Sequence, residues 1–195
     1  MNWLGVISLI LLLLTLTSTW WWMDCYLPNV GGYFKYDGNP ITFVWSSGNR
    51  SSLSLSLDIF KWLSEEGRIP PGASYRIGIS KFFLTLCTLF ISLSLLSTIY
   101  AIFSKSSRAY FIAAAFAFLS FLFYEFSFLA LEAPRSAFLT FQSDVGQNYV
   151  KWGEGIGKYL ALLLTILLVA SGFFNSYLYE RPVPRRRPRR GRGYW

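Results

Sequence analysis

AYFIAAAFAFLSFLFYEFSFLAL, residues 109–131, is a nearly unbroken apolar stretch with one charged side chain, Glu125. Each residue of an α-helix rises about 1.5 Å, and the hydrocarbon core of a bilayer is about 30 Å thick. The stretch is therefore long enough to cross a membrane, and only helices or closed barrels satisfy their backbone polar groups there. This segment predicts a transmembrane helix.

Three further stretches, 3–22, 82–103 and 159–179, meet the same test of length and apolarity. The first lacks the basic flank and small-residue cleavage site of a signal peptide, so we expect a permanent helix. Together the spans occupy nearly half of 195 residues and leave no room for a separate soluble domain. The chain is predicted to be an all-α membrane protein, a four-helix bundle over residues 1–179 with loops 24–81 and 132–158.

The net charge of +8 is concentrated in two segments. The connection 104–108 carries Lys105 and Arg108 without an acid, and the tail 180–195 carries arginines against Glu180 alone. The two long loops are close to neutral, with six basic and five acidic residues in the first and three of each in the second. The positive-inside rule then predicts cytoplasmic termini and outer loops on the far side of a plasma membrane or envelope.

Aromatic residues near the predicted span ends suggest two interfacial girdles. Those expected at the inner interface are Trp3, Tyr100, Tyr110, Tyr177 and Tyr179. Those expected toward the outer interface are Trp20, Trp21, Trp22, Tyr124 and Trp152.

The first outer loop contains its own structural signals. Segments 33–36 and 41–45 flank the turn residues 37–40, and their alternation predicts a small β-hairpin. A short helix is expected over 58–66, because Gly67 and two prolines follow it. The aromatic residues form either a small core or a partner surface, for which the candidates are Tyr33, Phe34, Tyr36, Phe43 and Trp45. Asn49 begins a glycosylation sequon in the same loop.

The residue inventory argues against conventional catalysis. The chain has no histidine, which removes the common haem, zinc and histidine-assisted nucleophile arrangements. Cys25 and Cys87 are expected to be free thiols packed as small apolar groups, although one bridge between them is an alternative. We therefore expect no enzymatic activity and no cofactor.

Small residues near two helices suggest close packing. The glycines of segment 153–158 resemble a phosphate-binding loop only superficially, because the required outer glycine and hydroxyl residue are missing. Gly153 and Gly157 instead have the spacing that lets helices approach closely, as do Ala113 and Ala117.

Glu125 is predicted to lie about 10 Å inside the outer boundary of its span. A charge at that depth needs a partner, and Lys158 and Lys81 are the best placed by sequence. The pair would act as an interhelical clamp, or Glu125 would serve a proton or ion relay. The clamp is the preferred interpretation because the inner half of the span offers only Ser120 as a further polar group.

The tail combines arginines with prolines, which predicts an extended, disordered segment. Such a segment binds anionic lipid at the cytoplasmic surface, and non-specific nucleic-acid binding is the alternative. The residues concerned are Arg181, Arg185, Arg186, Arg187, Arg189, Arg190 and Arg192.

The layout of spans and loops resembles the claudin and peripheral-myelin-protein-22 superfamily. Residues 20–22 and 32–37 look like a degenerate form of its Gly-Leu-Trp-x-x-Cys signature, with Phe34 at the tryptophan position and Asp37 at the first cysteine position. The loop disulfide of that family has no counterpart in this chain. The resemblance implies a non-enzymatic role in lateral assembly, cell contact or service as an auxiliary subunit.

The sequence thus favours a tetraspan membrane protein whose outer loops bind other membrane proteins or a second copy. Three alternatives stay open: an accessory subunit of a larger complex, an enveloped-virus membrane protein whose tail contacts nucleic acid, and a Glu125-dependent proton-coupled transporter.

Overall fold

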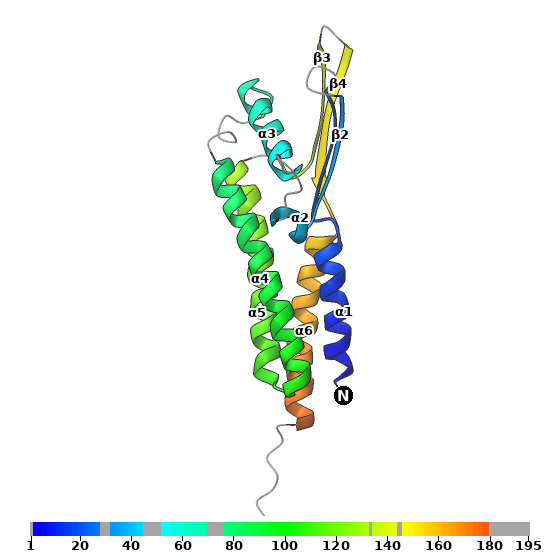
Figure 1. Cartoon of the computed structure of the whole chain (residues 1–195), viewed down its shortest axis with the longest axis vertical. Coiled ribbons are helices and arrows are strands. Elements are labelled where there is room, and N and C mark those ends of the chain that lie inside the picture. Colours follow the sequence, from blue (N-terminus) through cyan, green and yellow to red (C-terminus); the bar gives the residue numbers. More distant parts are fainter. Residues whose placement is uncertain are drawn as a thin grey trace, which may run out of the picture.

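The computed structural model describes residues 2–27, 32–44, 52–69, 76–132, 134–143 and 146–179. Within these ranges the chain forms six helices and one four-stranded antiparallel sheet (Figure 1). Three helices are long and apolar enough to cross a membrane, namely α4 (Ile77–Ser104), α5 (Ser107–Leu131) and α6 (Gly157–Tyr179). These helices indicate an integral membrane protein and match three of the four predicted spans.

The first predicted span, 3–22, is wrong at its outer end. Helix α1 (Trp3–Thr17) ends where Ser18 turns to an extended conformation and donates its N–H to the Leu14 carbonyl at 2.8 Å. Its 15 residues rise about 22 Å, less than a full hydrocarbon core. A bundle of four spans is therefore not confirmed, although α1 packs against α6 and α4.

Strand β1 (Trp21–Leu27) follows, and its burial alternates with a period of two. The odd-numbered positions from Trp21 to Leu27 are buried, whereas Trp22, Asp24 and Tyr26 lie on the other face. Because residues 3–22 form one continuous apolar stretch, hydropathy alone does not show where helix α1 ends and strand β1 begins.

The predicted hairpin in the first loop is also corrected. Strand β2 (Gly32–Gly38) contains the predicted first strand, but its partner is β1 rather than 41–45. The second segment is instead the short helix α2 (Pro40–Val44). Asn39 caps it, because its side-chain oxygen accepts the N–H groups of Ile41 and Thr42 at 3.0 Å. Asn-Pro is here a helix-start signal rather than part of a hairpin turn.

The two outer loops join in one sheet. Strands β3 (Ala137–Ser143) and β4 (Gly146–Glu154) extend it to the order β2-β1-β4-β3, so β1 of the first loop pairs with β4 of the second. Helix α3 (Ser52–Glu65) covers one face (Figure 1). The predicted helix at 58–66 is confirmed, and it begins earlier, within the serine-rich stretch.

Two cores hold the molecule together. The outer core joins the covered face of the sheet, α3 and the outer part of α5, and it includes Trp21, Phe60, Phe128 and Trp152. The bundle core is smaller and contains Ala113, Ala117, Leu164 and Leu168 among its members.

The predicted outer girdle is wrong for most of its members. Trp20, Trp21, Tyr124 and Trp152 are buried side chains of the outer core. The Trp20 ring packs edge-on against Tyr124, and Trp21 and Trp152 both pack on Phe60 of α3. At the other end of the bundle Trp3, Tyr100, Tyr177 and Tyr179 are exposed, as an interfacial girdle requires, but Tyr110 is buried.

Helix α1 begins and α6 ends at the end of the bundle farthest from the sheet (Figure 1). The side of the membrane on which the two termini lie stays a prediction. Asn49, Trp45 and the arginines of the tail lie outside the described residues.

Candidate functional site

A cluster of four charged residues lies where the helices meet the sheet. Lys158 Nζ at the start of α6 is 3.4 Å from Glu125 Oε1 on α5 and forms a closer ion pair with Glu154 at the end of β4. Arg135 contacts the same two carboxylates, at 2.5 Å from Glu125 Oε2 and 3.4 Å from Glu154 Oε1. Two cations and two carboxylates thus form a closed ring.

The predicted pair of Glu125 and Lys158 is therefore present. The Lys158 side chain is only 3% exposed, so its charge depends on these carboxylates. Sequence reasoning missed Arg135 and Glu154, which lie outside the spans. The spacing of Glu154 and Lys158, four residues apart, was the one available signal.

Glycines allow the start of α6 to approach the start of β1. Gly155 N–H donates to the Trp20 carbonyl and Gly157 N–H to the Thr19 carbonyl, both at 2.8 Å. A Cβ on Gly155 would collide with the Thr19 carbonyl oxygen, and one on Gly157 would collide with the Trp20 indole. The predicted close approach at Gly157 is confirmed, and this contact places Lys158 beside the sheet.

The junction is completed by α5. Tyr124 Oη donates to the Trp20 carbonyl at 2.7 Å, one residue before Glu125. Toward the inner end, the next polar contact is Ser120 Oγ, which donates to the Cys87 carbonyl at 2.8 Å. The segment of α5 that precedes Glu125 contains no acidic residue. The geometry favours a clamp between three elements over a relay.

The second candidate is the face of the sheet opposite α3. The strand register places Tyr33, Tyr26, Tyr149 and Thr140 in one cross-strand row. The neighbouring row consists of Lys35, Asp24, Lys151 and Phe138. An aromatic row thus lies beside a row of alternating charge.

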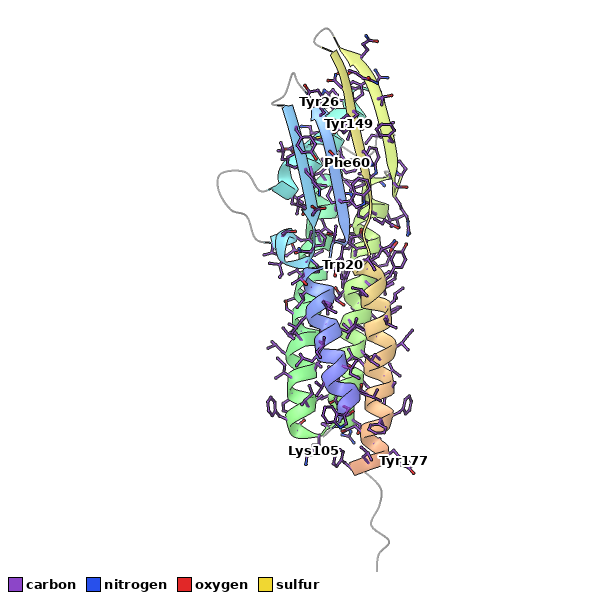
Figure 2. All side chains as sticks on the ribbon, turned by 90° about the vertical axis from the view of Figure 1, so that its right-hand side faces the viewer. Trp20, Tyr26, Phe60, Lys105, Tyr149 and Tyr177 are labelled. Atoms are coloured by element: carbon purple, nitrogen blue, oxygen red, sulfur yellow. The ribbon has the colours of Figure 1, made fainter. Side chains whose placement is uncertain are left out.

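Side-chain contacts fix the positions of the tyrosine rings on this outer face. The Tyr26 and Tyr149 rings are stacked with centroids 6.3 Å apart (Figure 2), and Tyr149 Oη donates to Asp24 Oδ1 at 3.4 Å. Loss of hydration, followed by the Asp24 charge, raises the pKa of Tyr33 and of Tyr149, so both are neutral phenols at neutral pH. Tyr33 is 60% exposed and Phe138 is 64% exposed. The face therefore presents apolar rings whose hydroxyl groups are either hydrogen-bonded or exposed to water.

The predicted partner surface divides between the two sides of the sheet. Tyr33 lies on the exposed face, whereas Tyr36 and Phe43 are buried and Phe34 packs against the outer core. Burial raises the pKa of Tyr36 to about 12. These three residues belong to the core, and sequence reasoning missed Tyr26, Phe138 and Tyr149 because their strands were not predicted.

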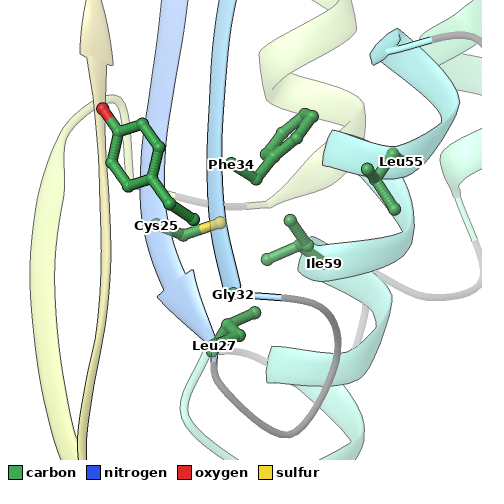
Figure 3. A pocket seen from close by; sticks show the side chains of 7 residues that line it. Cys25, Leu27, Gly32, Phe34, Leu55 and Ile59 are labelled. Atoms are coloured by element: carbon green, nitrogen blue, oxygen red, sulfur yellow. The ribbon is translucent and has the colours of Figure 1, made fainter.

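A small cavity of about 140 Å³ lies between the sheet and α3. Its walls include Cys25, Leu27, Phe34, Leu55 and Ile59 (Figure 3). Burial, and then the Asp24 charge, raises the pKa of the Cys25 thiol to about 11, so the thiol is neutral near pH 7. Cys25 and Cys87 are both buried and free, as expected.

The described residues contain no cluster of three metal-ligating side chains of the His, Cys, Asp and Glu type. No known protein-family model matches the chain, and no curated protein matches it in sequence. The resemblance to the claudin superfamily stays a prediction.

Proposed function

We propose that the protein is a non-enzymatic, four-span membrane protein that binds a protein partner, either another membrane protein or a second copy, through its outer sheet. The observation that carries this proposal is the exposed aromatic face around Tyr26, Tyr33, Phe138 and Tyr149. Tyrosine on a rigid strand provides a large contact area, and tyrosine is enriched among residues that dominate binding energy.

The attachment of the sheet to the bundle supports this role. Three residues separate α1 from β1, and two separate β4 from α6. The charged cluster links β4 and α6 to α5, and the hydrogen bond from Tyr124 to the Trp20 carbonyl links the start of β1 to α5. A partner on the sheet would therefore meet a surface with a fixed orientation relative to the membrane. The lateral assembly, adhesion and auxiliary-subunit roles all require such a surface.

Site-specific photo-crosslinking tests the proposal. A photoreactive phenylalanine analogue in place of Tyr33 should give a discrete crosslinked protein in native membranes. The matched control places the same analogue at Lys61. This residue is exposed on α3, the helix that covers the opposite face of the sheet. Equal crosslinking from both positions, or none from Tyr33, would contradict a specific sheet partner.

The identity of the crosslinked product separates the remaining alternatives. A product of twice the mass of the chain indicates self-assembly, and a constant heterologous product indicates an auxiliary or accessory subunit. If the protein is instead a transporter that depends on Glu125, its activity should not depend on Tyr33. Both proposed partner classes need the outer loops to face away from the cytoplasm.

Accessibility labelling tests that orientation. In intact cells a membrane-impermeant thiol reagent should modify a Gly146→Cys variant at the β3–β4 turn, but not a Ser106→Cys variant at the α4–α5 connection. Labelling of Ser106→Cys from outside would overturn the proposed topology, including cytoplasmic termini.

The tail is proposed to contact the anionic cytoplasmic surface. A peptide of residues 181–195 should prefer anionic vesicles over nucleic acid in direct competition at equal salt. Preference for nucleic acid would instead support the role in an enveloped virus.

A further inference from the structure

A groove lies between α4 and α5 at the end of the bundle farthest from the sheet. Its volume is about 320 Å³. Its walls come from the last turns of α4, the connection and the first turns of α5, and they comprise Leu96, Ser97, Tyr100, Ser106, Arg108, Ala109 and Ile112. The Arg108 guanidinium and the Ser106 hydroxyl thus lie at the end of the groove formed by the connection, and Leu96, Ser97 and Ile112 lie farther along the helices.

The connection that holds the basic end has a defined conformation. Lys105 ends α4 with a φ of 53°, and its carbonyl accepts a hydrogen bond from Asn175 Nδ2 of α6 at 2.5 Å. Ser106 caps α5, because its Oγ accepts the Ala109 N–H at 3.4 Å. The groove is therefore formed before any ligand binds.

The two cations of this connection lie in different environments. Lys105 Nζ lies 5.2 Å from the centre of the Tyr179 ring, on the side of α6 (Figure 2 labels Lys105 at this end). Arg108 lines the groove and is exposed, and within the described ranges no carboxylate pairs with it. The connection itself contains no acidic residue.

The apolar part of the groove is open to the surroundings of the bundle. Leu96 is 63% exposed and Ile112 is 50% exposed on helices of membrane-spanning length. In a bilayer these side chains are covered by acyl chains rather than by water. A free phosphate would occupy the basic end only and leave these walls uncovered.

We propose that this groove binds one anionic phospholipid, with its phosphate on Arg108 and one acyl chain along Leu96 and Ile112. Arginine binds phosphate oxygens through two parallel N–H groups, and the Ser106 hydroxyl adds a donor. Basic pockets between membrane helices are suited to anionic head groups. None of the residues that line the site belongs to the arginine tail, and the proposal does not depend on the outer sheet contact.

The test uses the purified full chain in phosphatidylcholine nanodiscs that contain a minor fraction of phosphatidylserine. Native mass spectrometry measures the ratio of retained phosphatidylserine to phosphatidylcholine. Arg108→Gln should lower the enrichment of the anionic lipid about five-fold, the value expected for loss of one basic contact. Arg108→Lys should lose less, because it keeps the charge but not the paired N–H groups.

Lys105→Gln is the matched control, since it removes the same charge from the same connection but outside the groove. Enrichment in that variant should fall less than in Arg108→Gln, because the Lys105 ammonium lies over the Tyr179 ring and not in the groove. All variants keep the tail, so lipid bound there cancels in the comparison. Equal losses in Arg108→Gln and Lys105→Gln would overturn the site in favour of a diffuse basic surface.

Ile112→Trp tests the groove without changing any charge. The larger side chain should fill the apolar part and lower phosphatidylserine retention by a similar factor. If the enrichment in Ile112→Trp equals that of the unmodified protein, the acyl-chain part of the proposal is wrong. Because Ile112 is half-exposed, this variant serves as the test even if Arg108→Gln does not fold.

Discussion

The outer sheet region and the helix bundle are packed by different means in one continuous chain. The outer core is filled by large rings, and Trp21 alone contacts Tyr36, Phe60 and Phe128 with ring centroids 5.4 to 5.7 Å apart. The fully buried helix contacts of the bundle instead include alanines and hydroxyl residues, and its phenylalanine pairs, such as Phe90 and Phe123, are only partly buried. Ser94 Oγ of α4 donates to the Ala113 carbonyl of α5 at 2.8 Å, and Ser8 Oγ of α1 lies 3.1 Å from Ser171 Oγ of α6.

This difference follows from the two solvents. In water, burial of aromatic area is strongly favourable, so large side chains stabilise the sheet against α3. In a bilayer, lipid tails are as apolar as leucine, and burial of large side chains between helices gains little. Helices in a bilayer are held together mainly by close backbone packing and interhelical hydrogen bonds, and small residues permit both.

The largest effect is expected at the outer core. Trp21→Ala removes a fully buried ring and should lower the free energy of unfolding by about 3–5 kcal/mol. Thermal unfolding of the purified protein in detergent measures the change. Tyr33→Ala, on the exposed face, should cost less than about 0.5 kcal/mol. Similar losses in both variants would show that the two faces of the sheet do not differ as described.

The charged cluster links the two regions. Its variants should distinguish the effect of the Glu125 charge on stability from the effect of the side-chain shape. Glu125→Lys places a third cation beside Lys158 and Arg135 and should destabilise the protein by about 3 kcal/mol. Glu125→Gln should cost less than about 1 kcal/mol, because Glu154 still pairs with Lys158. Unfolding and folded yield are the readouts. If Glu125→Gln keeps its fold but abolishes a proton flux in vesicles, the relay replaces the clamp.

The bundle should not tolerate large residues at its close contacts. Ala113→Leu inserts a larger side chain where α4 donates to the α5 backbone, and it should cost about 1–3 kcal/mol. Ile112→Leu, the adjacent half-exposed position, should be close to neutral. Thermal unfolding again provides the measurement. If Ala113→Leu leaves the free energy of unfolding unchanged, the described difference in packing between the bundle and the outer core is wrong.

The smallest effect concerns pH and belongs to the outer region. Burial raises the pKa of Cys25 from 9.0 to about 11, so between these values the folded chain keeps a proton that the unfolded chain loses. The stability from this group is therefore complete below pH 9 and is lost as the pH rises toward 11. Cys25→Ala should weaken that alkaline dependence, measured as the midpoint of unfolding at pH 8, 9 and 10.5.

Much of the bundle was predictable from local sequence. The predicted spans 82–103, 109–131 and 159–179 differ from α4, α5 and α6 only at their ends. The α3 helix and the free cysteines were also expected correctly. Hydropathy over some twenty residues suffices for a span because the bilayer acts on each helix separately.

Half of the candidate cluster was also visible in the sequence. Glu125 required a cation, and Lys158 was one of two proposed partners. Arg135 and Glu154 were not foreseen, because their positions depend on how the second loop folds. The exposed aromatic face was missed for the same reason, since it exists only when β1 and β4 align Tyr26 with Tyr149.

The sequence by itself determined where three helices cross, which segments are basic and which residue is charged within a span, because these properties depend on neighbouring residues alone. Tertiary structure decided that α1 ends at Thr17 and that residues 21–27 form a strand. It also turned the predicted girdle of Trp20, Trp21 and Trp152 into a core. A strand obtains its hydrogen-bond partners from distant segments, here β2 and β4, and no local pattern specifies those partners.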